Sequence, residues 1–315
     1  MIASRPLPTA ARRRSFRIVR MQNDFSLVVV PIFACSLIGL LWVKLRLPMN
    51  AACLSALVSN IGIPCLLLSS LDQPNLTARV LVHTFAAGAV ALACFAALGA
   101  LFLRALKLPL RQYLPSLMLP NTSNLGLPVA LFAFGEQGLL YAVAFSALVQ
   151  IGHFTIGVWL LSGRASWKSI AASPTIWAVA AALFMTVNGL HPSAPLAATA
   201  KQLGNMAPPL MLLMLGASLA NIRLAGLHRV ALLALVRVAG GLGVGLALAC
   251  LLGLPSVAAG AFVVQCTMPV AVLSHLIAQQ HDGPTEDIAG MILISTGLSL
   301  AGLPLMLASA KLVVG

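Results

Sequence analysis

The polar side chains best suited to chemistry lie together in the segment Leu119–Pro128, which reads Leu-Pro-Asn-Thr-Ser-Asn-Leu-Gly-Leu-Pro. Four polar residues, a glycine and two prolines interrupt an otherwise apolar run. Each proline removes a backbone donor and disfavours helical geometry in the residue before it. The segment therefore predicts a broken membrane helix, because free backbone groups at membrane depth are tolerated only where protein or a water-filled cavity satisfies them. Breaks of this kind indicate the binding site of a secondary transporter.

A second break is expected at Pro269, just after three residues whose side chains can donate hydrogen bonds. After a break, the second half-helix begins with unsatisfied N–H groups and a positive dipole end, which attract carboxylates without lysine or arginine. The candidate substrate-binding residues are Asn121, Thr122, Ser123, Asn124, Gly126, Gln265, Cys266 and Thr267. The alternative is a structural kink at each break, whose polar groups only satisfy free carbonyls.

Three ionisable residues fall within apolar segments and are candidates for further roles. His153 could carry a coupling proton, or it could be a packing histidine with satisfied nitrogens. His275 either lines the site, also as a coupling residue, or faces the membrane interface. For Arg237 we weigh an anion contact against a side chain that snorkels to the interface, and we favour snorkelling.

All six acidic residues are assigned to loops or to the N-terminal tail. This assignment argues against coupling through a buried acid and against a cationic substrate. The six cysteines lack CxxC spacing and are expected to be apolar packing residues. Because the sequence contains no phosphate loop, HExxH or GxSxG motif, we predict no enzymatic activity, no cofactor and no metal site.

The elements that must position these residues are membrane helices. The sequence is 60% hydrophobic and 8% charged, with a mean hydropathy of +1.00. A bilayer core needs about 20 apolar residues per helix, so we predict an all-α polytopic membrane protein with a single transporter domain over residues 26–315. Its ten expected spans are 26–43, 51–71, 80–103, 113–134, 138–161, 174–190, 197–219, 230–252, 257–278 and 287–311.

Basic residues account for the net charge of +13 without a nucleic-acid partner. Residues 1–25 read as a basic tail, or as an upstream extension with Met21 as the true start. In the loops, the side richer in basic residues is predicted to be cytoplasmic, which places both termini outside. The richer side carries Lys44, Arg46, Arg104, Lys107, Arg111, Arg164, Lys168, Arg223 and Arg229, and the other side carries Arg79, Lys201 and Lys311.

The two halves of the chain repeat, over residues of about 26–161 and 174–311. Spans two and seven share Asn-x-x-x-Pro, beginning at Asn60 and Asn205, and spans four and nine share Pro-Val-Ala. Because each half has five spans, the second half must be inverted in the membrane, as in many secondary carriers. Broken spans four and nine then cross near the midplane, and the crossover prolines are Pro120, Pro128 and Pro269.

These motifs resemble those of the auxin efflux carrier family. Leu119–Thr122 followed by Gly126–Pro128 is similar to the family's fourth-helix motif, and Met268–Ala271 and Pro208–Leu210 also fit. The resemblance covers residues 26–311 and implies a ten-helix carrier of organic anions with crossed helices four and nine. It implies that Asn121 contacts the substrate, and that spans one, two, six and seven form a scaffold through which a homodimer can form.

The long cytoplasmic loop of the large plant carriers is absent, so the sequence looks like a compact bacterial-type member in the inner membrane. We therefore predict a secondary active or facilitative transporter of a small organic anion, such as a mono- or dicarboxylate, that works by alternating access. Its partners are that anion and the lipid bilayer. Two alternatives stay open: a sodium- or proton-coupled carrier of the bile-acid symporter type, and a non-transporting membrane sensor with the same fold.

Overall fold

The computed structural model describes residues 25–69, 78–163, 168, 171–190, 192–220 and 227–314. The expected basic tail with Met21 and Asp24, and the loop residues Asp72, Arg164, Trp167 and Arg223, lie outside the described residues. Within the described ranges, every regular secondary-structure element is a helix. The prediction of an all-α protein is confirmed.

The first half of the described chain contains seven α-helices and three π-helical turns. They are α1 (Phe25–Lys44), α2 (Ala51–Leu57), η2 (Val58–Gly62), α3 (Ile63–Ser69), α4 (Ala78–Ala105), α5 (Leu110–Met118), η3 (Thr122–Gly126), α6 (Leu127–Gly152), η4 (His153–Gly157) and α7 (Val158–Ser162). Gly135 divides α6, because its φ of 67° and ψ of −164° are not helical. Only glycine adopts this backbone conformation readily.

The second half of the described chain is again helical. Its helices are α9 (Pro174–Val187), α10 (Ala194–Asn205), α11 (Ala207–Leu219), α12 (Leu227–Leu251), α13 (Ser256–Thr267), α14 (Val272–Gln280), α15 (Thr285–Ala301) and α16 (Leu303–Val314). The predicted range 287–311 is not one straight helix, since α15 and α16 meet at an angle of 60°. Gly302 and Pro304 explain the bend, because proline has no N–H for the helical ladder.

Four helical stretches of the described chain are long and apolar enough to cross a membrane, and the bent pair α15–α16 is a fifth candidate. The four are Ala51–Ser69, Val82–Ala105, Thr122–Ser162 and His228–Leu251. The prediction of a multi-pass membrane protein is supported. The finer prediction, ten spans in two inverted repeats, stays a prediction.

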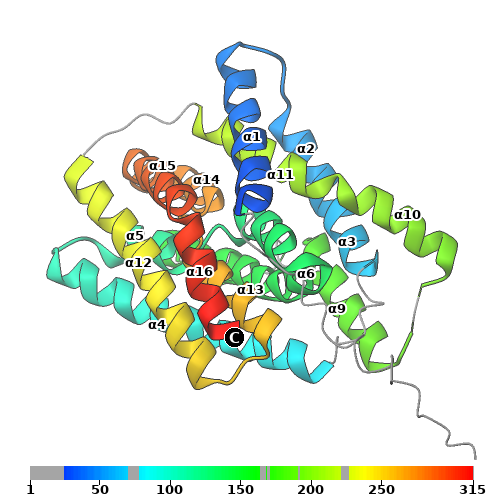
Figure 1. Ribbon diagram of the computed structural model, residues 1–315. Coiled ribbons are helices and arrows are strands. Elements are labelled where there is room, and N and C mark those ends of the chain that lie inside the picture. The colour runs from blue at the N-terminus through cyan, green and yellow to red at the C-terminus, as the bar shows by residue number, and fades with distance from the viewer. Residues whose placement is uncertain are drawn as a thin grey trace, which may run out of the picture.

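Small residues allow two pairs of helices to pack closely. α1 crosses α11 (Figure 1), where a Cβ on Gly39 would lie 2.0 Å from the Leu213 carbonyl oxygen and one on Gly216 1.7 Å from that of Ser36. α3 packs on α10 in the same way through Gly204. Close backbone approach at small residues is typical of helix packing in membranes.

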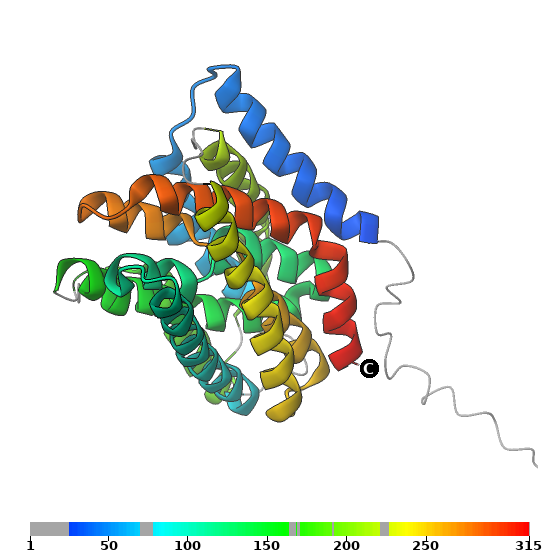
Figure 2. The same ribbon diagram turned by 90° about the vertical axis from the view of Figure 1, so that its left-hand side faces the viewer.

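A second group of helices surrounds α6 and α13, which pack against each other. α12 packs on α4, α13 and α15, and α16 packs on α13; Figure 2 shows the yellow α12 beside the red α16. The rings of Phe145 on α6 and Phe262 on α13 meet edge to face, with centroids 5.6 Å apart. This group of helices holds both of the predicted breaks.

Candidate functional site

The two helix breaks meet inside the protein. One lies between α5 and η3, at Leu119–Asn121, and the other between α13 and α14, at Met268–Ala271. Pro120 and Val270 form an isolated antiparallel bridge, and the Asn121 N–H donates to the Pro269 carbonyl at 2.7 Å. We call this meeting point, Leu119–Asn121 with Met268–Ala271, the crossing.

Two helical segments begin at the crossing without a side-chain cap. η3 begins after Asn121 and α14 begins after Ala271, and neither residue caps the following turn with its side chain. The Val270 N–H instead donates to Ser295 Oγ on α15 at 3.0 Å. The first N–H groups of a helix carry partial positive charge, so both starts present a positive end at the crossing.

Two buried amide side chains face this region with unused hydrogen-bonding atoms. Asn121 is 4% exposed and Gln265 is fully buried. Asn121 Nδ2 and both polar atoms of the Gln265 side chain have no hydrogen-bond partner among the described residues. Gln265 lies directly against Gly126, where a Cβ would be 2.3 Å from its Oε1. Because unpaired buried polar groups are unfavourable, these amides are well placed to bind a polar ligand.

The hydroxyls of Thr122 and Ser123 are engaged with α6. Thr122 Oγ1 donates to Ser146 Oγ at 3.1 Å, and the Ser123 and Ser146 hydroxyls are 2.8 Å apart. Ser123 and Asn124 are half-buried. Ser146 was not singled out in the sequence, since a lone serine in an apolar helix carries no signal, yet it fixes the turn that follows the break.

The three candidates before the second break point in different directions. Thr267 Oγ1 donates to the Val263 carbonyl of its own helix at 2.7 Å. Cys266 is buried in an apolar cluster with Phe95 and contacts α12, where a Cβ on Gly245 would lie 2.9 Å from its own Cβ. Of the three, Gln265 alone lies against the turn at Gly126.

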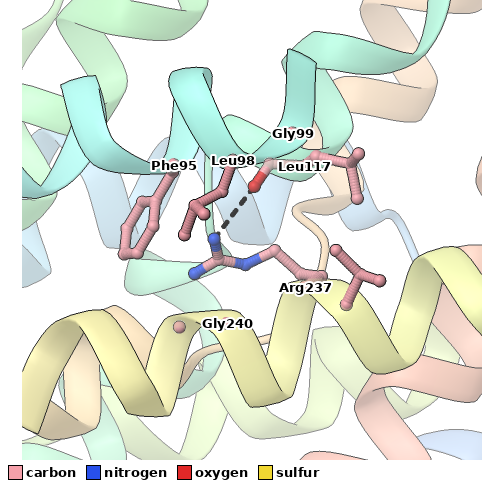
Figure 3. A pocket seen from close by; sticks show the side chains of 8 residues that line it. Phe95, Leu98, Gly99, Leu117, Arg237 and Gly240 are labelled. Carbon is pink, nitrogen blue, oxygen red and sulfur yellow. Dashed lines mark hydrogen bonds between the residues drawn. The ribbon is translucent and has the colours of Figure 1, made fainter. Parts of the chain in front are cut away.

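Arg237 does not snorkel, contrary to the interpretation that we favoured. It is 2% exposed, and its Nε and Nη1 donate to the carbonyls of Met268 at 3.2 Å and Leu117 at 2.9 Å. Its Nη2 donates to the Cys266 carbonyl, and the guanidinium lies 4.3 Å from the Phe95 ring centroid (Figure 3). The side chain turns inward because the ends of α5 and α13 offer carbonyls that lack helical partners.

The two histidines have separate structural partners. In buried His153, Nδ1 lies 3.0 Å from the Val149 carbonyl and Nε2 lies 3.2 Å from Ser274 Oγ. Since a carbonyl only accepts, Nδ1 carries the proton, and in a neutral ring the Ser274 hydroxyl donates to Nε2. His275 Nδ1 is instead 3.1 Å from the Thr285 carbonyl at the start of α15. His153 thus connects η4 to α14, whereas His275 contacts the first residue of α15.

The expectation that all acidic residues lie in loops or in the tail is wrong for Glu136, which is in α6, and for Glu286 and Asp287, which are in α15. Of these three residues, the buried one is Asp287. This residue is in the first turn of α15. Its carboxylate accepts hydrogen bonds from the Tyr113 hydroxyl and from Arg229. The cation and the positive end of α15 both stabilise a negative charge there, which explains how a carboxylate is accommodated inside the helix bundle.

Comparison with known proteins places these features in a family. A family model described as a membrane transport protein matches residues 24–170 and 158–307, which together cover most of the chain. No curated protein matches the chain. The family is the one that the fourth-helix motif at Pro120 and Asn121 resembles, and the chain belongs to it: this is a membrane transport protein of the auxin efflux carrier family.

Proposed function

We propose that the protein is a secondary active or facilitative carrier of a small organic anion, which binds at the crossing and moves by alternating access. The observation that supports this most directly is the pair of buried amides, Asn121 and Gln265, whose donors are unpaired beside two uncapped helix starts. An N–H donor gains most from a charged acceptor. Mono- and dicarboxylates present such charged oxygens.

The charges around the crossing favour an anion over a cation. Among the described acidic residues, Asp287 is paired with Arg229, and Glu136 forms an ion pair with Lys201 at 3.1 Å. None of the described acidic residues lies in the segments that form the crossing. The two helix starts attract a carboxylate, and the guanidinium of Arg237 offsets the carbonyl ends of α5 and α13 that would otherwise attract a cation.

We propose ten membrane spans for the carrier, arranged as two inverted repeats. The candidate span Thr122–Ser162 has 41 residues, about 60 Å of helix and twice the hydrocarbon thickness. The non-helical backbone at Gly135 supports dividing this stretch into two spans. Reciprocal packing also fits: α1 in the first half contacts α11 in the second, and α9 in the second half contacts α3 in the first.

In this proposal the α1, α2–α3, α9 and α10–α11 helices form the scaffold, and the helices around the crossing move against it. A homodimer would form through the scaffold. The basic loops orient both termini to the outside of a bacterial inner membrane. Substrate contact is assigned first to Asn121 and Gln265, with Ser123 and Asn124 beside them.

The first test is ligand binding by the purified protein. Malonate, malate, succinate and indole-3-acetate are added in a thermal-shift assay, because a ligand that binds only the folded state raises the midpoint; at about 100 times Kd the stabilisation is about 2.7 kcal/mol. Asn121→Ala and Gln265→Ala are expected to reduce the shift. The matched controls, Asn188→Ala and Gln202→Ala, change exposed residues outside the crossing and should keep it.

Transport is then measured in vesicles with the carboxylate that binds. Exchange across the membrane that needs no sodium supports the proposal. Exchange that requires sodium would favour the bile-acid type of carrier, and binding without exchange would favour the sensor. If Asn121→Ala transports malonate at the wild-type rate in protein of normal abundance, the assignment of the crossing as the binding site is wrong.

A further inference from the structure

One arginine joins the ends of both broken helices. The carbonyls that Arg237 contacts belong to Leu117 in the last turn of α5, to Cys266 in the last turn of α13, and to Met268 directly after it. Each side of the crossing therefore contributes at least one acceptor to the same guanidinium. The planar, five-donor head of arginine is suited to such a cluster, whereas a lysine presents a single point charge.

These carbonyls form a partly negative site that attracts a cation. The last carbonyls of a helix lack helical partners and carry about half a negative charge per helix end. Two such ends converge here, next to backbone that is not helical. In secondary carriers, unwound carbonyls and half-helix C-terminal ends are the groups that coordinate a coupling cation. Here the acceptors already have a cationic partner, supplied by α12.

The surroundings of the guanidinium contain no opposite charge from a side chain among the described residues. Its contacts are three carbonyls and the Phe95 ring face. A buried charge without a carboxylate partner is strongly unfavourable unless dipoles replace its water. The carbonyl ends and the ring quadrupole provide that replacement, so the charge of Arg237 is not cancelled by a neighbouring acid and contributes to the field at the crossing.

We infer that Arg237 is a built-in counter-charge: its guanidinium takes the place of a coupling cation at the carbonyl ends, so the crossing binds an anion without a metal ion. The inference deepens the proposed function and rests on it for the transported anion. The structural part of the inference, that these carbonyls need a cationic partner, does not depend on which ligand is transported. Arg237 is thus a positioning residue for the crossing and a determinant of its charge preference.

The inference can be tested by chemical rescue, in which a small cation in solution replaces the removed arginine side chain. A pocket between α4 and α12 reaches the guanidinium (Figure 3). Besides Arg237, its lining includes Phe95, Leu98, Gly99, Leu117 and Gly240. Removing the arginine side chain would enlarge this pocket next to the three carbonyls, where a small cation can then take its place.

The experiment compares purified wild-type protein, Arg237→Ala and a control, Arg104→Ala, which changes an exposed arginine at the end of α4. Thermal midpoints and malonate-induced shifts are recorded in millimolar guanidinium chloride, sodium chloride or tetramethylammonium chloride at equal ionic strength. We expect Arg237→Ala to have a lower midpoint and malonate affinity weaker by about tenfold or more. Guanidinium, or sodium at the vacated carbonyls, should raise both, with no such effect in the wild type or the control.

A second pair of variants separates charge from shape and covers the case in which the alanine variant does not fold. Arg237→Lys keeps the charge, and Arg237→Gln removes it at similar size. We expect the lysine variant to keep most of the malonate shift and the glutamine variant to lose it, even where their unliganded midpoints are alike. Equal malonate shifts in the two, or an Arg237→Ala midpoint that all three salts change equally, would overturn the inference. If the wild type itself responds to no carboxylate, the proposed function fails, while the salt response of Arg237→Ala still tests the carbonyl site.

Discussion

Replacing Gly126 by alanine is the sharpest single test of the contact between the two breaks. A Cβ at this position would lie 2.3 Å from Oε1, 2.9 Å from Cδ and 3.0 Å from Nε2 of Gln265. All three near atoms belong to one flexible side chain rather than to the backbone. The Gly126→Ala protein can therefore keep the crossing intact by moving the Gln265 amide about 1 Å or more, back to ordinary contact distance.

The magnitudes separate stability from binding. Alanine in place of glycine inside a helical turn is favourable by about 0.5–1 kcal/mol, and overpacking a buried site is unfavourable by about 1–3 kcal/mol. The net change in unfolding free energy therefore lies between no effect and a loss of about 2.5 kcal/mol. Displacing the Gln265 amide removes a hydrogen bond to a charged ligand worth about 1.5–3 kcal/mol, so malonate affinity should fall about 10- to 150-fold.

Thermal unfolding and malonate titration are measured on Gly126→Ala, Gln265→Ala and the double variant, with Gly243→Ala as the control. A Cβ at Gly243 meets no heavy atom within 4 Å, so the control should keep its malonate affinity. Removing the Gln265 side chain should relieve the clash, which makes the two substitutions non-additive in stability. Wild-type malonate affinity in Gly126→Ala, or strictly additive stabilities, would refute the placement of Gln265.

Three further predictions concern other parts of the protein. Gly216→Ala should lower the thermal midpoint by far more than Gly243→Ala, since its Cβ would meet the Ser36 backbone at 1.7 Å; a midpoint like that of the control would contradict this packing. Asp287→Asn should lower the free energy of unfolding by about 1–3 kcal/mol, because a buried hydrogen-bonded charge pair loses one partner. A double-mutant cycle with Arg229→Gln should show energetic coupling between the two residues. His153→Gln should lower the midpoint but leave the pH profile of vesicle transport unchanged; a flattened profile would indicate proton coupling through this residue.

The breaks were predictable from sequence because their causes are local. Pro120 and Pro269 act on the backbone within about four residues, and the polar residues that follow Pro120 stand out against an apolar background. Gly135 falls between the two predicted spans 113–134 and 138–161. The sequence did not show which side chains point toward the crossing. Gln265, Cys266 and Thr267 are consecutive in a helix, where neighbouring side chains point about 100° apart. The three side chains therefore could not all face one site.

The role of Arg237 was not predictable, because its partners are backbone carbonyls. Leu117 is 120 residues away from Arg237 in the sequence, and Cys266 is 29 residues away. Neither residue type indicates that its backbone carbonyl will accept a hydrogen bond from a side chain. From sequence alone, an arginine two turns into an apolar helix is equally compatible with a side chain that reaches the interface. Asp287 was misassigned for a related reason, since its partners Tyr113 and Arg229 lie on two other helices.

The charge preference of the crossing follows from adding its helix ends. Two half-helices begin there and two end there, and at about half a charge each their dipoles sum to zero. Broken helices alone therefore select neither an anion nor a cation. Arg237 is hydrogen-bonded only to the negative ends, so it neutralises that side and leaves the starts of η3 and α14 unopposed beside Asn121. On this account the proposed anion preference depends on one side chain that need not touch the anion. We expect the preference to disappear when that side chain becomes neutral while the crossing keeps its shape.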